Sequence, residues 1–248
     1  MQHVFQWPAV SHSLRLFPGR SVILGQLAAA VIAVNAVGQT AIPSPQGLLA
    51  ADPHVFVRWL KSNRPLLPTG VDRSDVLRML PPDGEVTELS WPERRKLTGL
   101  RSLLQSVTRD SSYEIRVVDI SLARVGIFGG LVLLISRPAL TILSGDELRA
   151  QVAHEIGHQY VSGDYDRASA AMDRRRLKEL ELLCDAIAIA QLQNLHIDPA
   201  ALMTGIEKVT RYNRKRFVVD ESKYPTLAER REFAREVAEW IGAASELP

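Results

Sequence analysis

A His-Glu-x-x-His sequence, formed by His154, Glu155 and His158, is the part of this chain best suited to chemistry. Residues four apart lie one turn apart on the same face of an α-helix, so the two imidazoles can bind one metal ion. Glu155 points about 100° further around the helix, where its carboxylate could take a proton from a water at the metal. The pattern is short enough to arise by chance, and the alternative is a helix with two surface histidines.

The sequence around this motif has the signals of a helix that could carry it. Ser144 and Glu147 form a capping box, in which each side chain hydrogen-bonds the backbone N–H of the other residue at a helix start. An apolar stripe with helical spacing follows, made of Leu148, Val152 and Ile156. The histidines lie on a different stripe, so this helix can pack on a core without burying them in it.

A third metal ligand is predicted from a second helix, expected over about residues 168–195. Glu181 lies far enough beyond His158 for one helix to end and the next to return beside it. Two imidazoles and one carboxylate would hold one Zn²⁺ and leave a coordination position for water. Asp185 lies one turn further along and can accept the second N–H of a zinc-bound histidine. The alternative is that both acids belong to the polar face of an amphipathic helix.

Apolar neighbours favour the ligand interpretation of these acids. Leu180, Leu183 and Ile187 adjoin them, and two carboxylates one turn apart in such surroundings would repel each other and lose hydration unless a cation lies between them. A purely structural zinc site would need a fourth protein ligand. Cys184 is the nearest candidate, but it points away from the stripe that carries Glu181.

Two segments are predicted to be β-strands. Residues 114–120 alternate polar and apolar side chains, and residues 130–136 are nearly all apolar. A glycine pair before the second segment would let another chain approach closely. We therefore expect an edge for an extended peptide substrate along Gly129, Gly130, Leu131, Val132 and Leu133. A buried core strand is the alternative.

The rest of the chain is predicted to be largely helical. Capping boxes begin at Ser90 and Thr226, while the many prolines of residues 39–89 allow only short helices there. Helices are expected over about 54–62, 74–79, 91–109 and 199–213, and in a last segment after Thr226. The predicted fold class is α+β, mainly helical, with a small β-sheet beside the His-Glu-x-x-His helix.

The composition is that of an ordinary globular protein. Of the 248 residues, 46% are hydrophobic and 23% charged, and the net charge of +2 gives no case for nucleic-acid binding. The basic runs 174–178 and 211–216 lack interleaved aromatic residues and are interpreted as solvated helix faces. The single cysteine, Cys184, excludes an intramolecular disulfide.

The N-terminal residues 1–38 have the order of a secretory signal sequence. Basic residues come first, residues 21–37 form a short uncharged apolar core, and small residues and prolines follow. Cleavage and export to the periplasm or the extracellular space are expected. The alternative is an uncleaved anchor that contacts the membrane through residues 21–37 and faces outside the cytoplasm. The remainder divides into a helical and loop region, 39–110, and a catalytic domain, 111–248.

Taken together, the motifs resemble the zinc peptidase family of CAAX prenyl proteases and HtpX-like proteases. The resemblance covers about residues 114–235 and is closest to the small exported members of the family. It rests on several motifs in the family's order: the segment 142–148, His-Glu-x-x-His at 154–158, Glu-x-x-Cys-Asp at 181–185, and Pro-Thr-x-x-x-Arg at 225–230.

The resemblance implies a zincin-like metallopeptidase domain of the gluzincin type. It implies that His154, His158 and Glu181 bind zinc, that Glu155 is the catalytic base, and that Asp185 supports a ligand from behind. The chain departs from the family at three positions. Cys184 replaces a usual alanine, Ala123 aligns where an asparagine often stands, and Tyr224 replaces a usual histidine. The hydroxyl of Tyr224 could donate to a developing oxyanion, or the side chain could simply pack.

The function expected from these features is zinc-dependent endopeptidase activity on protein or peptide substrates outside the cytoplasm, with protein quality control as one candidate role. The alternative is a metal-bearing binding or chaperone-like module with little or no proteolytic activity. No nucleic-acid partner is expected.

Overall fold

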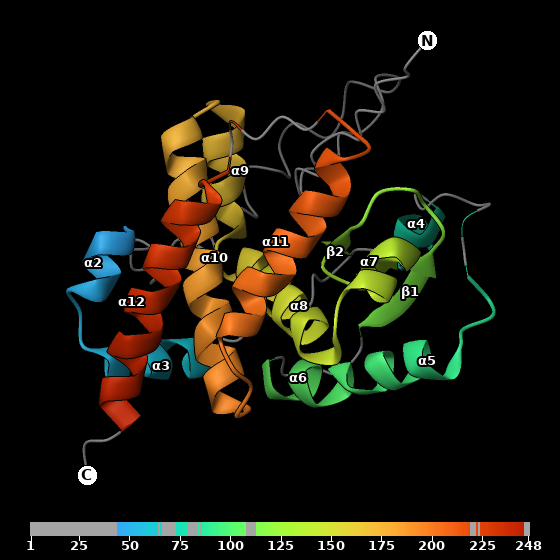
Figure 1. Cartoon of the computed structure of the whole chain (residues 1–248). Coiled ribbons are helices and arrows are strands. Elements are labelled where there is room, and N and C mark those ends of the chain that lie inside the picture. Colours follow the sequence, from blue (N-terminus) through green and yellow to red (C-terminus); the bar gives the residue numbers. More distant parts are fainter. Residues whose placement is uncertain are drawn as a thin grey trace, which may run out of the picture.

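A computed structural model describes the following residues of the chain: 44–63, 65, 73–78, 84, 86–107, 113–218, 222 and 224–245. In this part the fold is mainly helical, with one small mixed β-sheet to the side of the central helices (Figure 1). The predicted leader, residues 1–38, lies outside the described residues. None of the helices that the structure describes has the length and apolar character needed to cross a membrane.

The sheet has three strands in the order β1-β3-β2. β1 (Glu114–Val118) pairs in parallel with β3 (Val132–Ser136), and β2 (Val125–Phe128) pairs antiparallel with β3. β2 and β3 are joined by a tight turn at Gly129 and Gly130, whose φ angles are 54° and 67°. Positive φ angles are readily adopted only by glycine, so this pair is there to close a hairpin.

The predicted substrate edge at Gly129, Gly130, Leu131, Val132 and Leu133 is therefore wrong. β3 is the central strand, hydrogen-bonded on both sides, and all five of its residues are buried. A continuous apolar run is typical of such a strand, and the glycine pair turns the chain instead of admitting a peptide. Both predicted strands exist with shorter bounds. β2 was not predicted, because a four-residue segment interrupted by Gly126 carries little signal.

Two long helices form the centre of the molecule. α8 (Gly145–Tyr160) packs along α10 (Arg174–Asn194). A Cβ atom at Gly157 would lie only 2.9 Å from the Cα of Cys184, so the two backbones nearly touch where they cross. Cys184 is fully buried at this crossing, which fits a position for a small residue.

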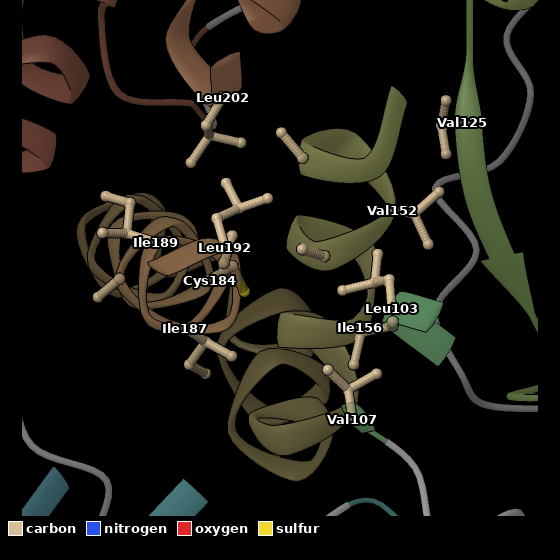
Figure 2. Close-up of a cluster of buried hydrophobic side chains, with 14 of the residues drawn as sticks. Leu103, Val107, Val125, Val152, Ile156, Cys184, Ile187, Ile189, Leu192 and Leu202 are labelled. Carbon is tan, nitrogen blue, oxygen red and sulfur yellow. The ribbon is translucent and has the colours of Figure 1, made fainter. Parts of the chain in front are cut away.

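The helix α8 is buried on several sides by apolar side chains (Figure 2). Val152 lies beside Val125 of β2, and Ile156 lies near Leu103 and Val107 of α6 (Leu100–Val107). Two further helices complete the bundle around α10, namely α11 (Ala200–Arg214) and α12 (Leu227–Ser245). The short α9 (Ser162–Ala170) lies between α8 and α10 in the chain and contacts both.

The remaining helices lie at the periphery: α2 (Pro45–Leu49), α3 (Pro53–Ser62), α4 (Arg73–Arg78), α5 (Trp91–Thr98) and α7 (Arg137–Ile142). The single helix predicted over 91–109 is divided at Gly99 into α5 and α6. α3 packs on α12 through Phe56, whose ring is 5.6 Å from that of Trp240. Helices from the region 39–110 thus share the main core with the C-terminal helices.

Candidate metal site

α8 places both histidines of the motif on the same side of the helix, facing Glu181 of α10. The helix begins with the predicted capping box: Ser144 N–H donates to Glu147 Oε2 at 2.7 Å, and Glu147 N–H donates to Ser144 Oγ at 3.2 Å. His154 is buried and His158 partly buried, and their rings meet edge to face with centroids 5.0 Å apart. Glu155 is partly buried beside them.

α10 brings the predicted third ligand to these histidines. Glu181 Oε2 lies 3.4 Å from His154 Nε2, and Glu181 Oε1 lies 3.6 Å from His158 Nε2. One ligand atom from each of the three residues lies within 4.8 Å of the other two, so the group could hold a metal ion. Cys184 does not belong to this group; it lies against the backbone of Gly157 instead.

Asp185 lies behind His154, on the side away from Glu181. Its Oδ1 is 2.9 Å from His154 Nδ1, and the carboxyl group is fully buried. A hydrogen bond at Nδ1 holds a proton there and directs Nε2, the nitrogen that would bind a metal after losing its proton, toward His158 and Glu181. This is the arrangement that a metal ligand needs.

Arg230 of α12 belongs to the same cluster, although no role was predicted for it. Its Nη2 donates to Glu181 Oε2 at 2.8 Å, and its Nε lies 3.2 Å from Asp185 Oδ2. The sequence contains a signal for this position. Arg230 lies on the stripe of α12 that continues through Ala234, Val237 and Ile241, and a charged residue on a buried stripe requires a partner.

Tyr165 of α9 is a second residue that the sequence did not single out. Its hydroxyl donates to Glu181 Oε1 at 3.3 Å, and its ring meets the ring of His158 edge to face with centroids 5.1 Å apart. Burial, followed by the charge of Glu181, raises the pKa of Tyr165 and keeps its hydroxyl protonated. A single tyrosine is a common residue in an amphipathic helix, so sequence alone gives no reason to choose it.

Tyr224 is placed differently. Its side chain is 44% exposed, just before the start of α12. Partial burial and the negative charges of Glu181 and Glu155 raise the pKa of its phenol, so it remains an O–H donor near the site. At Ala123, the backbone N–H and C=O are both bonded to the side-chain amide of Asn213 at 2.9 Å.

The electrostatics of the cluster favour a bound cation. Within the described part of the chain, Glu181 and Asp185 share one arginine partner, Arg230. Burial disfavours a charged His154, but its hydrogen bonds to Asp185 and Glu181 outweigh that effect and raise its pKa to about 10. Burial likewise opposes charge on Glu181, yet the nearby His158, His154 and Arg230 lower its pKa to about 2. The carboxylates thus favour positive charge on the ring of His154, whereas burial, opposed by the charge of Glu181, lowers the pKa of His158.

The sequence matches none of the known protein-family models, and no curated protein matches it. The case for a metal site therefore rests on the residues of the cluster themselves.

Proposed function

We propose that this protein is a zinc-dependent metalloendopeptidase of the zincin type. The observation that carries the proposal is the convergence of His154 Nε2, His158 and Glu181, with Asp185 bonded to His154 from behind. Two imidazoles and a carboxylate are a usual ligand set for catalytic zinc, and they leave a coordination position for a water or a substrate oxygen. The mainly helical α+β fold, with a small sheet beside α8, is compatible with this assignment.

When bound at this site, zinc would supply a water of lowered pKa and polarise the carbonyl of the scissile peptide bond. The remaining steps fall to side chains of this chain. Glu155 follows His154 directly on α8, close enough for its charge to act on His158. We assign it the role of general base, taking a proton from the attacking water and returning it to the leaving amine.

Arg230 and Asp185 would keep the ligands in place. Arg230 binds Glu181 Oε2 and so leaves Oε1 as the oxygen without a charged donor. Asp185 fixes the ring of His154. Because both partners are buried, their bonds to the ligands do not compete with bulk water, which favours a single ligand geometry.

Metal analysis of purified protein tests the first half of this proposal. Wild type should contain one zinc ion per chain, and Glu181→Ala should lose it. Glu239→Ala is the control, since Glu239 is an exposed glutamate of α12 that pairs with Arg235 and lies outside the cluster. Unchanged zinc content in Glu181→Ala would refute the third-ligand assignment.

Glu155→Gln tests the second half. This variant should retain zinc and lose the cleavage of an unfolded protein such as casein, because the amide cannot accept the water proton. A wild type that binds zinc but cleaves nothing, with Glu155→Gln indistinguishable from it, would refute the peptidase role and favour a binding module.

We also propose that the mature protein acts outside the cytoplasm, as the order of residues 1–38 suggests. Mass spectrometry of the protein recovered from cells would show whether this segment is removed. An intact N-terminus on protein recovered only from the cytoplasm would contradict export.

A further inference from the structure

Two of the three candidate ligands, His158 and Glu181, both contact Tyr165, a residue outside the His-Glu-x-x-His motif. α9 turns back after α8 and brings Tyr165 against the site. The ring of Tyr165 packs edge to face on His158 at 5.1 Å with an interplanar angle of 88°, while its hydroxyl lies 3.3 Å from Glu181 Oε1. One side chain therefore contacts one ligand from each of the two central helices.

The two oxygens of Glu181 are held by different groups. Oε2 accepts from Arg230 at 2.8 Å, a charged and buried donor. Oε1 accepts from the Tyr165 hydroxyl, a neutral donor that competes much less strongly with a cation. This division makes Oε1 the oxygen available to a metal, and Tyr165 the group that determines the direction in which it points.

α9 is itself held on α10, which fixes the position of Tyr165. Asp164, the residue before it, pairs with Arg176 Nη2 at 3.3 Å, and Arg176 Nη1 lies 3.0 Å from Glu179. The backbone N–H of Tyr165 donates to Val161 C=O at 2.9 Å. A tyrosine whose helix is anchored at Asp164 and at its own backbone N–H is suited to orienting a ligand.

We propose that Tyr165 is a positioning residue of the metal site, which orients Glu181 through its hydroxyl and His158 through its ring. The inference rests on the proposed metal binding, but not on proteolysis. It differs from the role considered for Tyr224, because Tyr165 contacts two ligands directly whereas Tyr224 is 44% exposed.

The test compares zinc affinity among variants by competition with a chromophoric chelator. Tyr165→Phe keeps the ring and removes only the hydroxyl, and its affinity should fall about 10-fold, within the range found when a group bonded to a metal ligand is removed. Tyr165→Leu removes both contacts and should fall further. Tyr212→Phe is the control, because Tyr212 lies on α11 and stacks on Arg216 through its ring; its affinity should equal that of wild type.

Cobalt substitution gives a second readout that does not depend on activity. The visible absorption bands of Co²⁺ report ligand geometry, so Tyr165→Phe should shift them relative to wild type, while Tyr212→Phe should not. Thermal unfolding of the metal-free proteins would show that Tyr165→Phe is folded.

The proposal is overturned if Tyr165→Phe binds zinc within twofold of wild type and shows an unchanged cobalt spectrum while Glu181→Ala loses the metal. That result would leave the proposed function standing. A wild type that binds neither metal would overturn both proposals together. Metal binding without proteolysis, combined with weaker binding by Tyr165→Phe, would refute the peptidase role and support the role of Tyr165.

Discussion

Two glutamates of this protein are buried beside a cation, and their surroundings differ. Glu147, in the first turn of α8, accepts from Lys208 Nζ at 2.8 Å, and the lysine side chain is 43% exposed. Glu181, in the middle of α10, accepts from Arg230 at 2.8 Å, and the arginine side chain is only 8% exposed. Glu147 also accepts the N–H of Ser144, whereas Glu181 faces two histidines and lies one turn from Asp185.

The difference separates a structural carboxylate from one with capacity for a further cation. The charge of Glu147 is balanced by one lysine and by the helix N-terminus, so the pair needs nothing more. Around Glu181 the described residues place two carboxylates against one arginine, Arg230, and these carboxylates raise the pKa of His154 to about 10. A Glu–cation pair is thus a sign of a metal site only when the local negative charge exceeds what the protein itself neutralises.

The largest effect is expected from removing the buried cation. Arg230→Met would leave Glu181 and Asp185 buried without their countercharge, and loss of one partner from a buried ion pair typically costs about 3–5 kcal/mol. The free energy of unfolding in urea, measured without metal, should fall by about this amount. Added zinc should restore part of it, because a divalent ion supplies the missing positive charge.

The neighbouring arginine gives a matched control. Arg231 lies next to Arg230 on α12 and also pairs with a glutamate, Glu207, but its side chain is 54% exposed. Arg231→Met should change stability far less, and zinc should affect it as it affects wild type. Equal destabilisation by the two substitutions, or no rescue of Arg230→Met by zinc, would contradict the distinction drawn between the two kinds of pair.

A smaller effect is expected where α8 crosses α10. Gly157→Ala would place a Cβ 2.9 Å from the Cα of Cys184, and forcing a methyl into such a contact costs about 1–3 kcal/mol. Since the crossing also sets the distance from the histidines to Glu181, zinc affinity should fall with stability. Gly145→Ala, at the start of α8 with nothing within 4 Å of the added methyl, should leave both unchanged. Wild-type zinc affinity in Gly157→Ala would show that the crossing does not position the ligands.

Sequence reasoning succeeded where the structure depends on neighbours along the chain. The caps at Ser144 and Ser90 and the helix that carries His154 and His158 follow from residues within two turns of each other, and all are present. Glu181 could be chosen as a partner because its helix is long and its neighbours are apolar. In the structure it lies beside both histidines.

What the sequence could not provide depends on packing between distant segments. Arg230 reaches Glu181 only because α12 lies along α10, and Tyr165 reaches it only because α9 packs against both α8 and α10. The strand β3 was correctly expected to be apolar, yet whether such a strand is central or at an edge is decided by its partners. Those partners include β2, a segment too short to predict.

The smallest effect is expected at the first glutamate of the comparison. Glu147→Gln removes the charge that pairs with Lys208 and weakens the capping box, a loss of about 1 kcal/mol. Burial opposes the charge of Glu147, but Lys208 and Ser144 outweigh it and lower its pKa below 4.5. A carboxyl group with a lowered pKa contributes stability above its unfolded pKa and loses that contribution as pH falls through the folded value.

The stability difference between wild type and Glu147→Gln should therefore be constant from neutral pH down to about pH 5 and shrink below about pH 4.5. Zinc affinity should be the same in both proteins at neutral pH, because Glu147 lies two helical turns before His154. Among the described residues, its role there is limited to the capping box and the pair with Lys208. Thermal unfolding as a function of pH, together with chelator competition, measures both quantities. A loss of zinc affinity in this variant would mean that the helix start positions the metal ligands, so that the two glutamates would differ in degree and not in kind.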